Sequence, residues 1–270
     1  MKQACFNQDA NSNNNVQMRV TYNPLNKINL RMKNIRTILL LTLPFVWLSG
    51  CVINIQDSIS GNGNVVKQQR DVPGFTGIKV GSGIDVYLTQ GDSQQVEVEA
   101  DENLQEWIRT EVSDNVLQIY SDKNIRLAKS KKVMVTCKTI DRLEVSSAGD
   151  LHGMNKFTAD KLDIQMSSAG DLRFEVDANE ISISISSAGN ALLRGKTNTL
   201  RADLSSAGDL NAFELEARVG DISVSSAGNA KVYITEEASF RSSSAGDINY
   251  RGEPRIKEIH TSSAGSVNRK

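Results

Sequence analysis

The side chains that most often perform acid–base chemistry, those of histidine, aspartate and glutamate, are scattered along this chain of 270 residues. The two histidines, His152 and His260, lie far apart and each stands beside a predicted turn. Carboxylates such as Asp160, Glu175, Glu236 and Glu237 are scattered over different predicted loops. Polysaccharide lyases and hydrolases need convergent carboxylates, or a calcium ion with a basic residue, in one groove. The sequence shows no such cluster, so we predict no catalytic residue.

The chain has three cysteines, Cys5, Cys51 and Cys137. Cys51 closes the segment MKNIRTILLLTLPFVWLSGC, which has a basic start, a short apolar stretch and then small residues. That order is typical of a signal peptide, and the apolar stretch is shorter than the roughly 20 residues that a membrane-spanning helix needs. The last four residues resemble the lipobox of bacterial lipoproteins, in which cleavage precedes a cysteine that becomes lipid-modified. We therefore predict lipid attachment at Cys51 and a place in the cell envelope, as an outer-membrane lipoprotein.

These landmarks divide the chain. Residues 1–31 precede a complete signal peptide and are predicted to be an over-long reading frame or a disordered extension. The signal peptide is 32–50, the lipidated N-terminus and linker are 51–70, and one domain fills 71–270. Without residues 1–51 the chain loses six basic residues and one acidic residue, so its formal net charge falls from −1 to −6. An acidic chain is a poor partner for nucleic acid, and the membrane contact is expected through the lipid alone.

A pentapeptide, SSAGD or a close copy, recurs through the second half of the chain. It begins at Ser146, Ser167, Ser186, Ser205, Ser225, Ser243 and Ser262. A near-constant period of this size indicates a solenoid, and the flanking segments alternate apolar and polar residues, as strands do. We predict an all-β fold, a parallel β-helix (solenoid) with about 19 residues per coil. Its irregular N-terminal coils are 71–140 and its repeat coils 141–270.

Side-chain parity predicts how each coil is arranged. Leu162, Ile164 and Met166 share one face, and the same parity predicts that the second serine, Ser168, points inward with its six equivalents in a buried column. The glycine, as at Gly208, is predicted to supply the positive φ of a tight corner. The fifth residue, Asp, Asn or Ser, is predicted to bond the neighbouring backbone in an Asx-type turn.

Stacked aspartates raise the alternative of a calcium site, as in calcium-binding β-rolls. Carboxylates about 5 Å apart repel by roughly 1 kcal/mol in water, so a metal-free stack should be interrupted by neutral residues. The column is interrupted, at Asn190 and Asn229, and its only adjacent aspartates are Asp150 and Asp171. The GGxGxDxUx pattern of calcium rolls is absent. We therefore predict no metal and no cofactor.

Cys137 lies alone in the alternating run VMVTCKT and is predicted to be a buried structural thiol. Before that run, from residue 59, the period fades although the alternation persists. The segment DENLQEWIRTEV is predicted to hold one short helix with Trp107 and Ile108 on its buried side.

A family resemblance follows from two features of the sequence. The segment FTGIKVGSGIDVYLTQGDSQQVEVEADENLQEWIRTEVSDNVLQIYS, followed by serial SSAGD corners, resembles the putative autotransporter adhesin head GIN domain family, from Phe75 to Val267. The Gly-Ile-Asn of the family's name reads Gly83-Ile84-Asp85 here. The resemblance implies a right-handed parallel β-helix, often on lipoproteins or secreted proteins of Gram-negative bacteria. It implies no established catalytic activity and supplies no catalytic residue.

We therefore expect a non-enzymatic, lipid-anchored envelope protein whose rigid β-helix presents its surface and variable loops to a glycan or protein ligand. Two alternatives stay open: a carbohydrate-active β-helix enzyme, and a purely structural envelope protein. The residues after Cys51 contain no dense acidic run of the kind that some lipoproteins use for surface export. The absence of such an acidic run favours the periplasmic side of the outer membrane.

Overall fold

The computed structural model describes residues 58–270, so the predicted signal peptide and Cys51 lie outside the described residues. Within residues 58–270 the chain forms strands and one short 3₁₀ helix, η3 (Glu102–Leu104). None of the helical segments in this range is long and apolar enough to cross a bilayer. The predicted all-β solenoid with a coil of about 19 residues is confirmed.

The strands fall into an N-terminal group and a repeat group. The N-terminal strands are β1 (Ser58–Ser60), β2 (Val65–Arg70), β3 (Gly77–Val80), β4 (Asp85–Gln90), β5 (Gln95–Asp101), β6 (Ile108–Ser113), β7 (Val116–Ser121), β8 (Asn124–Leu127) and β9 (Lys131–Cys137). The repeat strands are β10 (Arg142–Val145), β11 (Asp150–Gly153), β12 (Phe157–Met166), β13 (Asp171–Ile185), β14 (Asn190–Leu204), β15 (Asp209–Val224), β16 (Asn229–Ser242), β17 (Asp247–Arg251), β18 (Arg255–Thr261) and β19 (Ser266–Arg269).

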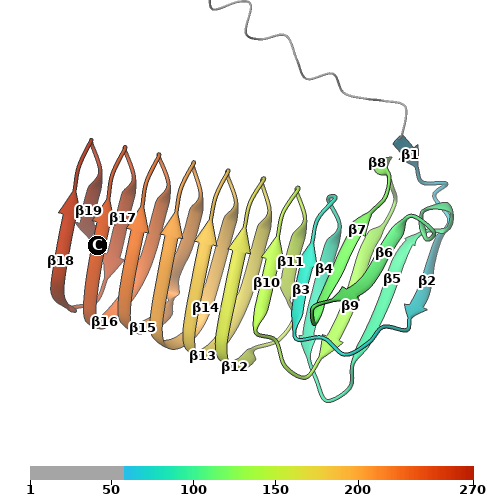
Figure 1. Cartoon of the computed structure of the whole chain (residues 1–270), viewed down its shortest axis with the longest axis horizontal. Coiled ribbons are helices and arrows are strands. Elements are labelled where there is room, and N and C mark those ends of the chain that lie inside the picture. The colour runs from blue at the N-terminus through green and yellow to red at the C-terminus, as the bar shows by residue number, and fades with distance from the viewer. Residues whose placement is uncertain (1–57) are drawn as a thin grey trace, which may run out of the picture. The chain divides into compact units, whose positions relative to one another are not determined.

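Each repeat coil contributes to two facing sheets, which we call wall A and wall B. Wall A contains the strand segments that precede the SSAG turns, and wall B contains those that follow them. Strand β13 shows the arrangement: Asp171 pairs with Asp150 of β11 in wall B, and Ile185 pairs with Met166 of β12 in wall A. All pairings from β10 to β19 are parallel, and the register between neighbouring coils is interrupted only by a few β-bulges in the pairings of β14, β15, β16 and β18. Figure 1 shows these strands side by side, with the turns aligned along one edge.

Seven of the N-terminal strands, β2 to β7 and β9, extend the two walls with a different topology, whereas β1 and β8 form a separate two-stranded parallel sheet. In wall A, β10 pairs with β3 and β3 with β7, and β6 then pairs antiparallel with β7. In wall B, β11 pairs with β4 and β4 with β9, after which β5 and β2 join antiparallel. Strands β1 and β2 lie within the segment 51–70, which was predicted to be a linker.

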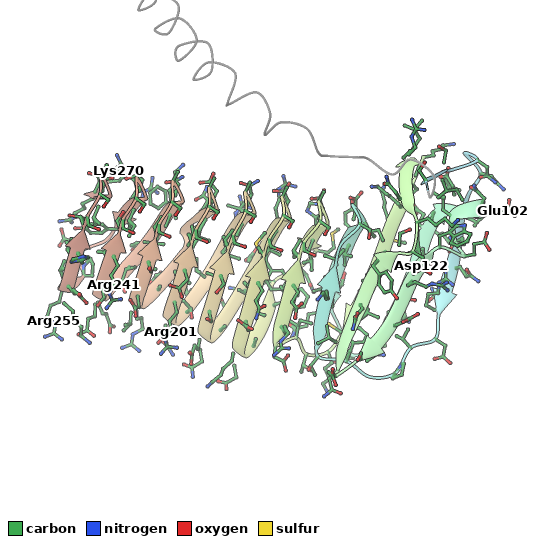
Figure 2. All side chains as sticks on the ribbon, turned by 45° about the horizontal axis from the view of Figure 1, so that its top comes forward. Glu102, Asp122, Arg201, Arg241, Arg255 and Lys270 are labelled. Carbon is green, nitrogen blue, oxygen red and sulfur yellow. The ribbon has the colours of Figure 1, made fainter. Side chains whose placement is uncertain are left out.

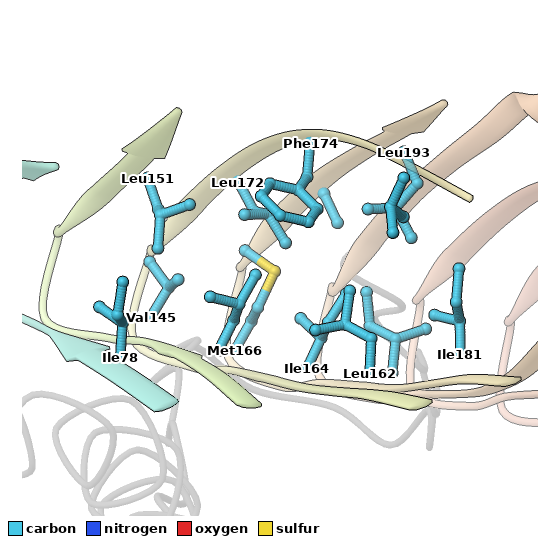
Figure 3. Close-up of a cluster of buried hydrophobic side chains, with 14 of the residues drawn as sticks. Ile78, Val145, Leu151, Leu162, Ile164, Met166, Leu172, Phe174, Ile181 and Leu193 are labelled. Carbon is cyan, nitrogen blue, oxygen red and sulfur yellow. The ribbon is translucent and has the colours of Figure 1, made fainter. Parts of the chain in front are cut away.

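A single aliphatic core fills the space between the walls. Leu162, Ile164 and Met166 are buried, as their shared parity predicted. Figure 3 shows the inward side chains of wall A, such as Val145 and Met166, facing those of wall B, such as Leu151 and Leu172. Two of the aromatic residues of the core, Phe157 and Phe174, pack on each other with their ring centroids 4.6 Å apart. Cys137 belongs to this core, so the prediction of a buried thiol is confirmed.

The SSAG corner is a tight two-residue turn, and the predicted inward column of second serines is wrong. In the first copy the Gly149 N–H donates to the Ser146 carbonyl oxygen at 2.9 Å, and Ser147 and Ala148 both have positive φ, 50° and 56°. Positive φ at both central residues is the signature of a type I′ turn. The strand parity ends at the first serine because the chain reverses there. The second serines are consequently exposed at the tips.

Glycine has a different role from the one predicted. None of the seven repeat glycines has positive φ; the serine and alanine before each glycine do. The first six of these glycines are buried, and a Cβ added to Gly170 would lie 2.8 Å from the Val145 carbonyl oxygen of the preceding coil. Glycine is needed because the backbones of successive coils approach closely at this point. The Ala148 N–H donates to the Ser168 carbonyl oxygen of the next coil at 3.0 Å. This bond gives a backbone N–H of the exposed turn an acceptor within the protein.

Two further expectations need correction. The helix predicted in DENLQEWIRTEV is reduced to the single 3₁₀ turn of η3, because Ile108 begins strand β6 and pairs with Ser121. Ile108 is buried, whereas Trp107 is only partly so. The segments between successive SSAG turns, expected to hold variable loops, are continuous strands of 14 to 16 residues in β13 to β16. Their differences are β-bulges, as between Ala212 and Glu216.

Candidate binding grooves

Two shallow grooves run beside the aligned turns, one on each wall. Groove A, on wall A, has a volume of about 640 Å³ and groove B, on wall B, about 350 Å³. Groove A is lined by the first serines of five turns together with the outward residues Lys79, Glu144, Gln165, Ser184, Asp203 and Ser223. Groove B is lined by Asp171, Asn190, Asp209 and Asn229, together with Arg173, Leu192, Asn211 and Lys231.

The repeat itself creates groove A. The residues just before the turns, such as Val145 and Met166, point into the core, so that only the small side chains of the first serines stand beside the tips. The backbone of the groove floor is already bonded between coils, as in the 3.0 Å hydrogen bond from the Ser167 N–H to the Val145 carbonyl oxygen. The groove therefore offers a row of hydroxyl groups at intervals of about 4.8 Å along the stack.

Groove A does not have the geometry of a glycosidase. Glu144 already pairs with Lys79 at 3.1 Å. Register places Gln165 and Ser184 between Glu144 and Asp203, so the two carboxylates are three inter-strand steps, roughly 14 Å, apart. Catalytic carboxylate pairs are separated by about 5 to 9.5 Å. The groove thus lacks the spacing that acid–base cleavage of a glycan requires.

A smaller hollow of about 440 Å³ at the bend opposite the turns also contains carboxylates. Asp177 and Glu216 lie two inter-strand steps apart there, and Lys196 stands between them in register. Asp177 is bound to Lys156 at 2.5 Å. Because the register places Lys196 between Asp177 and Glu216, and Asp177 is already paired with Lys156, this hollow is no better suited to catalysis.

The carboxylates named from the sequence are not brought together. Glu236 accepts hydrogen bonds from the Arg218 guanidinium at 2.7 and 3.1 Å, and Asp160 contacts Asn179. Hydrogen bonds from Lys257 and Arg255 hold the pKa of Glu237 below its usual value. Figure 2 shows Arg201, Arg241 and Arg255, which form such cross-coil pairs, on the outer surface of the coils. Residues 58–270 contain no group of three or more His, Cys, Asp or Glu side chains placed to hold a metal ion.

The fifth position of the repeat forms a ladder along wall B. Asn190 donates to the Asp171 carboxylate at 3.0 Å, and Asn229 donates to Asp209 at 2.7 Å. The predicted Asx-type turns are therefore replaced by bonds between coils, because this residue opens the wall B strand and its side chain faces outward. Ser266 bonds Asp247 in the same way.

Sequence reasoning missed one member of this ladder. Asp85 is the register partner of Asp150, which makes three consecutive aspartates with Asp171. The signal was present in Gly81-Ser82-Gly83, which forms a turn with positive φ at Ser82 and Gly83 like the SSAG turns. Burial, with the negative charges of Asp171 and Asp85, raises the pKa of the Asp150 carboxyl.

The remaining candidate residues have structural surroundings. Burial raises the pKa of the Cys137 thiol to about 11, so the reactive thiolate is suppressed at neutral pH. His260 is exposed on β18, as expected of a solvated histidine. His152 is partly buried, and its ring centroid lies 5.3 Å from that of Tyr87. Cys51 lies outside the described residues.

The same fold occurs in known proteins. Residues 74–254 match the sequence family described as putative auto-transporter adhesin, head GIN domain. A solved putative adhesin from Bacteroides fragilis NCTC 9343 superposes with a TM-score of 0.70 at 23% identity, covering 78% of this chain and 98% of the other. No curated protein matches this chain.

Two Parabacteroides structures are also similar. A putative lipid binding protein from Parabacteroides distasonis ATCC 8503 has a TM-score of 0.65 and 22% identity, over 79% of this chain and 99% of the other. A putative adhesin from Parabacteroides merdae ATCC 43184 has a TM-score of 0.63 and 19% identity, over 79% and 99%. At these identities the likeness establishes a common fold.

Proposed function

Because this chain belongs to the putative auto-transporter adhesin, head GIN domain family, we propose that it is a non-enzymatic binding protein of the cell envelope, with groove A as its principal contact surface for a glycan or protein polymer. Lipid on Cys51 would anchor it to the outer membrane, and the solenoid would act as a rigid support. The family and its solved relatives carry the name of adhesins, which is the coarse class that this proposal refines.

Groove A is the observation that carries the proposal. It crosses the strands β3, β10, β12, β13, β14 and β15, and repeats the same hydroxyl group at each turn. A polymer also repeats its polar groups, so an extended chain lying along the groove could form the same hydrogen bond in several coils. Many weak equivalent contacts of this kind add to a useful affinity without any single deep pocket.

The proposal is tested by filling the groove in the full-length protein. We would display the chain on bacterial cells and measure adhesion to surfaces coated with mucin, collagen or peptidoglycan. The double variant Ser184→Arg/Ser223→Arg places two long side chains in groove A, where Asp203 stands between them in register and can pair with both. Asn211→Arg, in groove B, is the matched control.

We expect the unmodified protein to raise adhesion to at least one coating, the double variant to abolish most of that gain, and the control to keep it. Adhesion that is no higher than with the empty vector on all three coatings would contradict the proposed function. Equal adhesion by the double variant and the unmodified protein would show that groove A is not the contact surface.

A further inference from the structure

A third groove, groove C, lies on wall B at the N-terminal end of the stack. Its volume is about 400 Å³, and it is lined by Tyr87, Thr89, Lys132, Met134, Thr136 and Met154, with Lys67 and Glu99 at its margin. These residues come from β4, β9, β5, β2 and the segment after β11. Groove C differs from grooves A and B because it contains an aromatic ring and two methionines.

The Tyr87 ring is held in a fixed orientation by its neighbours. Register places Met134 on one side of it and His152 on the other. The rings of Tyr87 and His152 are tilted by 30° with centroids 5.3 Å apart. Tyr87 alternates with the buried Val86 and Leu88, so its side chain faces outward and is partly exposed. The ring is therefore a preformed apolar platform on the surface of a rigid wall.

The two lysines near the Tyr87 ring differ in their ion pairs. Lys67 is bound to Glu97 at 3.0 Å and to Glu99 at 3.6 Å. The Lys132 ammonium forms no ion pair within residues 58–270, and lies 5.9 Å from the centroid of the Tyr87 ring. The partly exposed Thr89 and Thr136 are register partners, so their side chains stand next to each other beside the ring. One ammonium and two threonines thus border the apolar platform.

We infer that groove C binds one pyranose unit of a glycan. A pyranose ring has an apolar face of C–H bonds and an edge of hydroxyl groups. The Tyr87 ring and the exposed side chain of Met154 match the face, and Lys132, Thr89 and Thr136 match the edge. Two lysines, a glutamate and two threonines line this open groove beside the apolar groups, and charged and hydroxyl groups of this kind do not favour a lipid tail. The inference rests on the proposed binding function and supplies the class of its ligand.

Titration calorimetry of the full-length protein tests this assignment. The probes are chitotetraose, cellotetraose, mannotetraose and galactotetraose, which differ in their hydroxyl pattern but share the pyranose ring. The variants are Tyr87→Ala, which removes the platform, Tyr87→Phe, which keeps it, and Lys132→Gln. Tyr233→Ala and Arg251→Gln are the matched controls, because these register partners face outward from β16 and β17 on the same wall, outside the three grooves.

We expect at least one probe to bind, and Tyr87→Ala to weaken that binding about tenfold or more, since aromatic contacts carry much of the energy of such sites. Tyr87→Phe should stay within roughly threefold of the unmodified protein, and Lys132→Gln should weaken binding measurably. Both controls should leave the affinity unchanged. Thermal melting shows that each variant is folded.

Three results would overturn the inference: no binding of any probe, full binding by folded Tyr87→Ala, or equal losses in the Tyr233→Ala control. The failure of this inference is separable from the failure of the proposed function. Adhesion that depends on groove A, without any tetrasaccharide binding, removes groove C as a sugar site and leaves the proposed function intact. The absence of both adhesion and tetrasaccharide binding removes both.

Discussion

Single glycines set how closely the coils approach each other. A Cβ on Gly208 would lie 2.8 Å from Ile185 Cγ2 and 3.0 Å from the Ile185 carbonyl oxygen of the preceding coil. We predict that Gly208→Val destabilises the protein by about 1 to 3 kcal/mol through overpacking. Gly74→Val is the control, since a Cβ there would meet nothing within 4 Å. Chemical denaturation measures both, and equal stability of the two variants would contradict the close-approach role of Gly208.

Repulsion between aspartates of the wall B ladder lowers the stability of the protein at one position. Asp150 lies between Asp85 and Asp171 and has no amide neighbour in the column, unlike Asp171 and Asp209. We predict that Asp150→Asn stabilises the protein by about 0.5 to 1 kcal/mol at pH 7, because it removes carboxylate repulsion at the surface. Asp209→Asn is the control, and it should not stabilise because Asp209 accepts a hydrogen bond from Asn229.

The stability difference between Asp150→Asn and the unmodified protein depends on pH because the pKa of Asp150 is raised. The ionised form is the unfavourable one in the folded state, so its cost is present above the folded-state pKa and disappears as the pH falls through that pKa. Denaturation at pH 7 and at about pH 4 should show the advantage of Asp150→Asn shrinking at the lower pH. An advantage that grows on acidification would show that the carboxylate is stabilising.

At the scale of the element, each turn carries two exposed residues in a left-handed conformation. L-residues pay about 1 kcal/mol or more for this region, and Asn-Gly is the preferred pair of a type I′ turn. We predict that Ser206→Asn/Ala207→Gly raises the stability of the protein by about 1 kcal/mol, measured by thermal or chemical denaturation. Ser184→Asn, on the outward face of a strand, is the control and should be neutral or slightly destabilising.

These elements show what the sequence could and could not predict. The period follows from the spacing of the pentapeptide. The strands and the inward positions of Leu162, Ile164 and Met166 follow from alternation, because each wall buries one face. The turn was misread because parity was carried through Ser168, although a two-residue reversal places that residue at the tip. Groove C was not foreseen, since Tyr87, Lys132 and Met154 come from three separate segments that only the stacking brings together.

For the whole molecule, the decisive question is where the solenoid is anchored and which compartment it faces. We predict that Cys51→Ala abolishes incorporation of labelled palmitate in a bacterial host and releases the protein from the membrane fraction. Protease treatment of intact cells should leave the unmodified protein protected if it faces the periplasm. Its digestion would place it on the cell surface, and labelling that persists in Cys51→Ala would refute lipid attachment at this residue.

The two ends of the stack differ. At the N-terminal end the outermost strands are antiparallel, while the last strand of wall A, β18, is exposed along its length, with Ile256 and Ile259 37% and 50% exposed. Each coil bonds only to the coils beside it, and the register is kept apart from a few β-bulges. Duplication or loss of one 19-residue unit would therefore lengthen or shorten groove A by one increment of about 4.8 Å and leave its cross-section unchanged. The length of groove A is thus a quantity that genetic recombination can adjust in whole steps.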